Sequence, residues 1–292
     1  MTERVADQIV SGLEAHEVER LYCVPGESYL ALLDALHGSK RISTIACRHE
    51  SGAGFMAVAE AKMTGRPGVF AVSRGPGATN GSIAVHVAQQ DAVPLVMLIG
   101  QVGREERGRG AFQEVDYTAF LGGMTKAVFE VHDAGKVAET MVRAFHCAAQ
   151  GVPGPVAIVL PEDLLGEPAT GRLPAPYPVH RPHASPDDAE AVMVRLEVSR
   201  RPILIAGGAM RSRRGIAALK SFAMAHGVPV AVTWKNQDVF DNSSPLYAGH
   251  LGFGNPPAHR KALAEADLII ACGTRLGDVA SQNYSFPRAP QP

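Results

Sequence analysis

Two side chains that could move a proton, His49 and Glu50, follow Arg48 at one junction in the chain. The apolar run "ISTIAC" precedes them, and the stretch "SGAGFMAVAEAKMTG", rich in glycine and alanine, follows. Such small residues let a backbone or a flat ligand approach closely. A carboxylate where a strand meets a helix is either a first-turn residue that the helix dipole favours or a catalytic acid. This stretch alone leaves both roles open for Glu50.

A second glycine-rich segment, "SRGPGATNG" at residues 73–81, follows an apolar run. We expect it to form a loop that leads into a helix, where backbone N–H groups could meet a polar ligand. The segment lacks the lysine of a P-loop and the glycine spacing of a dinucleotide fingerprint, so phosphate binding is not indicated. A plain glycine turn is the alternative.

Two further segments have an open role. "AFQEVD" follows the polar, irregular run "GQVGREERGRG", so Phe112 and Gln113 could flank a small polar substrate or belong to a solvated loop. "IAGGAM" at residues 205–210 follows an apolar run and could hold a nucleotide, but it does not complete G-x-G-x-x-G. Packing of a strand against a helix is the favoured interpretation there.

Composition excludes several classes of protein. The formal net charge of -1 provides no basic field for nucleic acid. No apolar run approaches the ~18 residues of a membrane span, and the N-terminus has no signal-peptide core. The histidines form no H-E-x-x-H pair, no G-x-S-x-G elbow occurs, and the four cysteines lie far apart. We therefore expect no zinc site, no membrane contact and free thiols in the cytoplasm.

Short Val/Ile/Leu-rich runs alternate with helical patterns, which predicts an α/β fold with two doubly wound, mostly parallel sheets. We expect a first domain over residues 1–165 and a proline-rich linker over 166–186. A second, Rossmann-like domain over 187–292 would follow. Because "SQNYSFPRAPQP" lacks the closing strand and helix of such a sheet, we expect this second domain to be incomplete.

Five motifs, in one order, resemble those of the thiamine-diphosphate enzymes of the acetohydroxyacid synthase (acetolactate synthase) type, and the resemblance covers essentially the entire chain. They are "CVPGESYLALLDAL", "RHESGAGFMAVAEAKMTGRPGV", "SRGPGATN", "VPLVMLIGQV" and "AFQEVD". The resemblance implies that Glu50 is the catalytic glutamate that hydrogen-bonds N1′ of the cofactor's aminopyrimidine. That contact favours the imino tautomer, through which thiazolium C2 loses its proton. The implied reaction is decarboxylation of a 2-oxo acid, or carboligation of the resulting carbanion to a carbonyl acceptor.

The same resemblance assigns further site residues. The implied cofactor-binding residues, besides Glu50, are Pro25, Gly26, Gly75, Pro76, Gly77 and Asn80. Phe112 and Gln113 are expected to face the substrate. In the family the cofactor lies between this domain of one subunit and the diphosphate-binding domain of another, so a homo-oligomer, a dimer or a tetramer, is implied.

Departures from the family pattern weaken acetolactate formation in particular. Ser73 and Arg74 replace a Thr-Ser pair, and Val279 stands where the family has an arginine that contacts substrate. FAD in the middle domain stays open, because "GHLGFGNPPAH" is only loosely similar to the family's segment.

The family's G-D-G motif with its downstream asparagine is absent from these residues, so we expect no Mg²⁺ or diphosphate site and an inactive isolated chain. Two alternatives are a noncatalytic or split-system subunit, completed by a partner polypeptide, and a nucleotide-binding oxidoreductase.

Overall fold

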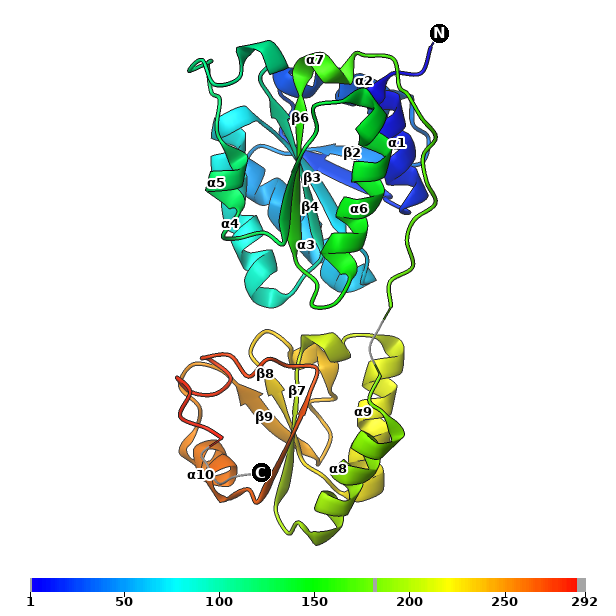
Figure 1. The fold of residues 1–292 in the computed structure, drawn as a ribbon. Helices are drawn as coiled ribbons and strands as arrows, with labels where there is room; N and C mark the ends of the chain where they lie inside the picture. Colours follow the sequence, from blue (N-terminus) through cyan, green and yellow to red (C-terminus); the bar gives the residue numbers. More distant parts are fainter. Residues whose placement is uncertain (1, 181–182, 288–292) are drawn as a thin grey trace. The chain divides into compact units, whose positions relative to one another are not determined.

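The computed structural model describes residues 2–180 and 183–287. The chain divides into two compact units, residues 1–182 and 183–292 (Figure 1). The expected linker includes residues 181–182 and the expected second domain includes 288–292, which lie outside the described residues. None of the described helices is both long enough and apolar enough to cross a membrane.

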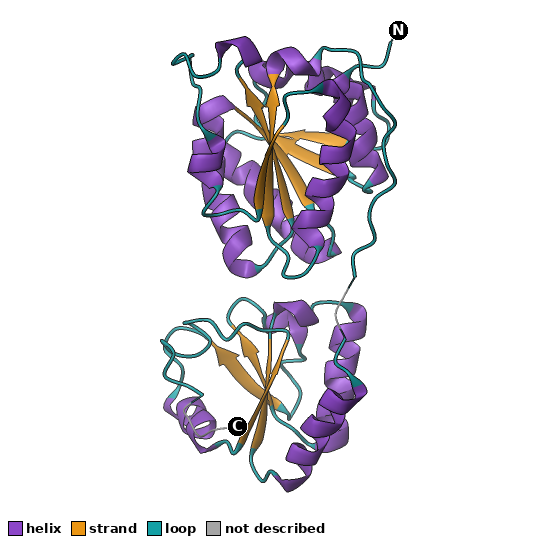
Figure 2. Ribbon diagram, in the orientation of Figure 1, coloured by secondary structure: helices purple, strands orange, loops and turns teal. Residues whose placement is uncertain are grey.

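The first unit is built on a six-stranded sheet in which every pairing is parallel, in the order β2-β1-β3-β4-β6-β5. Figure 2 shows the strands of this sheet with helices on either side. Its strands are β1 Arg20–Cys23, β2 Ser43–Ala46, β3 Gly68–Ser73, β4 Leu95–Gln101, β5 Ala127–Glu130 and β6 Pro155–Pro161. β3, β4 and β6 are apolar along almost their whole length because helices cover both faces of the sheet. The predicted α/β class with parallel sheets is confirmed.

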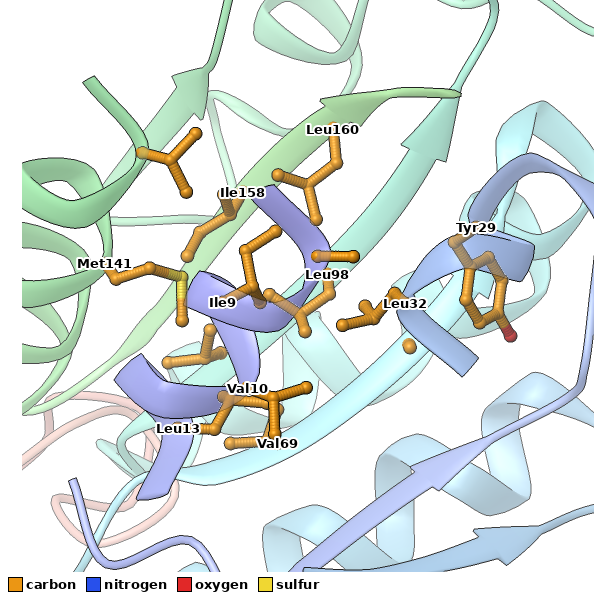
Figure 3. Packing of buried hydrophobic residues seen from close by; sticks show 14 of the residues in the cluster. Ile9, Val10, Leu13, Tyr29, Leu32, Val69, Leu98, Met141, Ile158 and Leu160 are labelled. Carbon is orange, nitrogen blue, oxygen red and sulfur yellow. The ribbon is translucent and has the colours of Figure 1, made fainter. Parts of the chain in front are cut away.

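Helices cover both faces of this sheet. They are α1 Val5–Ala15, α2 Leu30–Gly38, α3 Glu50–Thr64, α4 Arg74–Asp91, α5 Tyr117–Leu121, α6 Val137–Ala149 and α7 Glu162–Leu165, with 3-10 turns η1 Glu27–Tyr29, η2 Arg104–Glu106 and η3 Ala134–Lys136. One core cluster joins α1, α2 and α6 to one face, and Figure 3 shows Ile9 of α1 and Met141 of α6 in it. A second cluster joins α3, α4 and α5 to the other face through Phe70 and Met97.

The strand order places a switch point between β1 and β3. After β1 the chain moves to β2 on one side and then returns to β3 on the other side of β1. In open parallel sheets, ligands bind outside the carboxyl ends of the strands at such a point. All strands of this sheet are parallel, so the segments after β1, β2, β3, β4 and β6 meet at that edge.

Two glycines let α3 lie unusually close to its neighbours. A Cβ atom added at Gly68, the first residue of β3, would be 2.0 Å from the backbone oxygen of Ala57 in α3. One added at Gly54 of α3 would be 2.5 Å from Cβ of Ala84 in α4. These close approaches fix the position of α3 relative to β3 and α4.

The second unit repeats the architecture on a smaller scale. Its four parallel strands follow the order β10-β7-β8-β9. The elements are α8 Pro186–Val198, β7 Pro202–Ala206, η4 Gly208–Met210, α9 Arg213–His226, β8 Val230–Thr233, η5 Gln237–Val239, β9 Tyr247–Leu251, α10 Pro257–Glu265 and β10 Leu268–Cys272. Two further core clusters cover the faces of this sheet.

We predict that Gly68→Ala destabilises the protein by about 1–3 kcal/mol, because the new methyl group must displace the backbone of α3. Denaturant unfolding followed by circular dichroism would measure this. Gly52→Ala is the matched control, since a Cβ atom there meets nothing within 4 Å. An unfolding midpoint for Gly68→Ala equal to that of the wild type would contradict the close packing of α3 on β3.

Candidate functional site

Glu50 lies at the carboxyl edge of the first sheet, as the first residue of α3. The N-cap residue His49 accepts a hydrogen bond at Nδ1 from the backbone N–H of Ser51, at 3.2 Å, and so helps to begin the helix at this point. The Glu50 side chain is half-buried. The junction therefore presents one carboxylate at the edge where the strand ends converge.

The carboxylate of Glu50 is held from α4. Asn80 Nδ2 donates a hydrogen bond to Glu50 Oε2 at 2.9 Å. On the other oxygen's side, a Cβ atom added at Gly77 would lie only 3.4 Å from Glu50 Oε1 and 3.2 Å from Cβ of Val72. One oxygen is thus fixed by an amide, and the other lies over a backbone that carries no side chain.

The segment 73–81 is not the loop expected from its glycines, because α4 begins at Arg74 and already contains Gly75, Pro76 and Gly77. Tertiary contacts override the low helix propensity of glycine here. The backbone N–H of Gly75 donates to the carbonyl of Gln113 at 3.0 Å. Pro76 falls within the first helical turn, where a missing N–H is tolerated.

Gly26 meets the end of β3 at the switch point. A Cβ atom added at Gly26 would be 2.4 Å from Cβ of Ser73, so only glycine fits without displacement. The hydroxyl of Ser28, which is fully buried, lies 2.9 Å from that of Ser73. Pro25 precedes this contact and is exposed. The fold therefore brings the segment after β1 onto the start of α4.

The segment after β4, residues 102–116, is braced by Glu114. Its carboxylate accepts hydrogen bonds from the backbone N–H groups of Gly108 (2.7 Å) and Ala111 (3.4 Å) and from Nε of Arg107 (3.1 Å). The Gly108 N–H, with the help of the other two donors, lowers the pKa of Glu114 below its ordinary value. Hydrogen bonds between its own residues therefore hold the conformation of this loop.

Within that loop the two expected substrate residues differ. Gln113 has a left-handed backbone (φ 64°), and its carbonyl accepts the bond from Gly75. Phe112 is 73% exposed, so its ring projects from the loop. The structure thus brings Gln113 to the start of α4, whereas Phe112 points to solvent.

Burial changes the acidity of groups beneath the edge. Tyr29 is almost fully buried, its hydroxyl donates to the carbonyl of Val24, and burial raises its pKa. Burial likewise raises the pKa of the Cys23 thiol to about 11, with a smaller contribution from Cys47. Both groups therefore stay protonated near neutral pH and take no part in acid-base chemistry there.

Arg74 is a charged group at this edge that was not assigned to the site from the sequence. Arg74 is only 9% exposed and donates from Nη2 to Glu162 Oε2 at 2.6 Å. Its Nη1 lies 3.5 Å from Glu27 Oε1. Two signals for it were present in the sequence: its place between an apolar run and a glycine-rich one, and the replacement of the family's Thr-Ser pair by Ser73 and Arg74.

The His, Cys, Asp and Glu side chains and the backbone of the β7–η4 connection bear on the metal and nucleotide expectations. Among residues 2–180 and 183–287, no group of three His, Cys, Asp or Glu side chains could hold a metal ion. In the second unit, the backbone N–H groups of Gly207, Ala209 and Met210 donate to carbonyl groups of the chain itself. They are therefore not available to cradle a nucleotide phosphate.

Comparison with known proteins connects this geometry to a family. Residues 3–120 match the family described as thiamine pyrophosphate enzyme, N-terminal TPP binding domain. Residues 189–292 match the description thiamine pyrophosphate enzyme, central domain.

Curated relatives agree with these matches. The chain is 34% identical over 279 residues to acetolactate synthase of Mycobacterium bovis. It is 32% identical over 282 residues to the acetolactate synthase large subunit of Lactococcus lactis, and 33% identical over 278 residues to the isozyme 2 large subunit of Escherichia coli. Each match covers 94% of this chain but 45%, 48% and 50% of the respective relative. The chain spans about half the length of these relatives.

We predict that Glu114→Ala opens the 102–116 loop, because the variant removes the acceptor of three hydrogen bonds. Limited trypsin digestion should then cleave after Arg107 and Arg109 several-fold faster than in the wild type. Glu105→Ala, in the same loop at an exposed position, is the control and should leave the rate unchanged. Equal cleavage rates for the Glu114 variant and the wild type would contradict this bracing role.

Proposed function

Because the chain belongs to the thiamine pyrophosphate enzyme family, we propose that it forms part of a thiamine-diphosphate-dependent enzyme that decarboxylates a 2-oxo acid or acts as a carboligase. Glu50 is the residue that activates the cofactor. The observation that carries this proposal is the contact of Glu50 with Asn80 beside the bare backbone of Gly77.

The residues present fit an aminopyrimidine ring. Such a ring is flat and needs an acidic group at its edge and space over its face. Gly77 places no side chain beside Oε1 of Glu50, whereas Gly26 and Gly75 let the chain itself pack closely around this edge, against Ser73 and Gln113. Pro25, Gly26 and residues 75–80 of α4 are the residues that would hold the ring, with Glu50 at its edge.

Bound thiamine diphosphate supplies a carbanion nucleophile and an electron sink. The task of Glu50 is to share a proton with N1′ of the ring. Asn80 donates a hydrogen bond to Oε2 at 2.9 Å, so Oε1 would be the oxygen that meets the ring. An amide that donates to one oxygen also restricts the rotation of the carboxylate, so the acid is oriented before the cofactor binds.

Substrate recognition is assigned to the loop after β4. Gln113 is held at the start of α4 through its carbonyl, so its side chain lies on a segment that contacts the proposed cofactor site. Phe112 projects from the same braced loop. We assign both residues to the face that meets the 2-oxo acid.

The diphosphate and Mg²⁺ require other residues. The described part of this chain offers no cluster that could bind the metal. We therefore assign that role to residues outside this sequence. The backbone N–H groups of Gly207, Ala209 and Met210, after β7, donate to the chain's own carbonyl groups, and the proposal does not include FAD.

An exposed apolar face supports a homo-oligomer. Phe55 and Met63 of α3 and Ile83 of α4 are 40%, 88% and 53% exposed, and the exposed Ala59 lies on the same helix as the first two. Exposed apolar groups gathered on neighbouring helices mark interaction surfaces. We assign this face to contact with another subunit, as the oligomeric arrangement of the family implies.

We predict that Ile83→Glu weakens subunit association, because it places a charge on this apolar face. Light scattering across a dilution series measures the native mass of the full-length protein. On dilution, the mass of the variant should begin to fall at a higher protein concentration than the mass of the wild type. Met224→Glu, at a position 64% exposed in the second unit, serves as the control. Identical dissociation of the Ile83 variant and the wild type would remove this face from the interface.

We also predict that Glu50→Gln slows exchange of the cofactor's C2 proton with deuterium by about 10²–10⁴-fold in the full-length protein, because the acid that shares a proton with N1′ is lost. Proton NMR of the bound cofactor measures the exchange. Glu60→Gln changes a second glutamate of α3 that pairs with Arg20, and should leave the exchange rate intact. Rapid exchange in the Glu50 variant, with cofactor bound, would refute the assignment.

A further inference from the structure

Arg74 is a buried cation beside the proposed cofactor site. It begins α4 and immediately precedes Gly75, yet its relative exposure is only 9%. Its backbone adopts a left-handed conformation (φ 44°), which is unfavourable for a non-glycine residue. Such a conformation persists only where the surroundings hold it. The fold therefore fixes a guanidinium at the carboxyl edge.

The guanidinium is only partly paired. Of its five N–H donors, one makes a hydrogen bond within residues 2–180 and 183–287, from Nη2 to Glu162 Oε2 at 2.6 Å. Nη1 lies 3.5 Å from Glu27 Oε1, which is longer than a well-formed charged hydrogen bond. Nε is buried without a partner among the described residues. Arg74 has donors to spare for another carboxylate.

The two neighbouring carboxylates are held unequally. The Glu162 side chain is 35% exposed and makes the short contact, whereas the Glu27 side chain is 67% exposed and makes the long one. Glu27 can therefore turn into solvent at little cost, and a carboxylate ligand can take its place on Nη1. Glu162 would remain as the anchor that keeps the guanidinium in position.

Resting on the function proposed above, we propose that Arg74 binds a carboxylate of a 2-oxo acid substrate in place of Glu27. Gln113, whose carbonyl bonds the next residue along α4, places the proposed substrate loop directly beside this group. Arg74 is then a specificity-determining residue that selects an anionic substrate over a neutral one of the same shape.

The carboxylate concerned is the one that the substrate keeps. An ion pair with a carboxylate that leaves as neutral CO₂ stabilises the ground state more than the transition state, and so opposes the reaction. A carboxylate that persists in the product carries its charge throughout. Arg74 therefore suits the carboxylate of a 2-oxo acid acceptor, which remains on the product after the new carbon-carbon bond forms.

Competition between two acceptors tests this specificity. The full-length protein, with thiamine diphosphate and Mg²⁺, receives one 2-oxo acid as donor. Equal amounts of a second 2-oxo acid and of the aldehyde with the same side chain compete as acceptors.

Arg74→Met should lower the ratio of acid-derived to aldehyde-derived product by about 10- to 100-fold, and Arg74→Lys should restore part of that ratio. Glu27→Gln should raise the ratio. An unchanged ratio in Arg74→Met would overturn the proposal.

A binding experiment separates this proposal from the proposed function. Calorimetry measures the Kd of oxamate, an unreactive 2-oxo acid analogue, with its ethyl ester as the neutral control. Arg74→Met should weaken oxamate binding by about 10- to 100-fold and leave the ester unaffected, and Glu27→Gln should tighten oxamate binding. A wild-type protein that binds thiamine diphosphate but no oxamate refutes only the role of Arg74, not the proposed function.

Failure of the wild-type protein to bind thiamine diphosphate refutes the proposed function. The oxamate titrations then still decide the role of Arg74. Should Arg74→Met not fold, unchanged oxamate affinity in Glu27→Gln would overturn the proposal.

Discussion

The site depends on the close packing of α3 against β3 and α4. Parallel strands bring all the relevant segments to one edge, but the contact of Glu50 with Asn80 also requires the first turn of α3 to meet the second turn of α4. Gly54 and Gly68 permit that approach, because any side chain there would collide with Ala84 or with the backbone of α3. Glycine loses more conformational freedom on folding than other residues, and here that cost allows the packing that positions the Glu50 carboxylate.

The chemistry of the edge divides between two regions. Around Glu50 the chain presents glycine backbone and one amide, which suits a flat, largely apolar ring. Around Arg74 it presents a buried cation with two carboxylates, which suits an exchange of anions. α4 contributes to both regions, because Arg74 begins it and Asn80 lies on its second turn. A ring and an anionic substrate bound at the two regions would therefore be positioned by one helix.

Much of this arrangement could be predicted from the sequence, for identifiable reasons. Apolar runs without alternation indicate strands covered on both faces, and this predicted the parallel sheets. An acid at the boundary between an apolar run and a small-residue stretch placed Glu50 at a helix start, where the structure has it. The helical state of Gly75–Gly77 could not be predicted, because it depends on contacts with Gln113 and other distant residues. The pairing of Arg74 with Glu162, 88 residues away, likewise depends on strand order.

The central claim is that Glu50 meets the cofactor's pyrimidine ring, and a crystal structure of the full-length protein with thiamine diphosphate tests it most directly. The account predicts a Glu50 oxygen about 2.6–3.2 Å from N1′, with Asn80 still bonded to the other oxygen. It also predicts ring atoms in contact with the backbone of Gly77. A pyrimidine ring bound elsewhere, or an N1′ atom that faces a group other than Glu50, would contradict it.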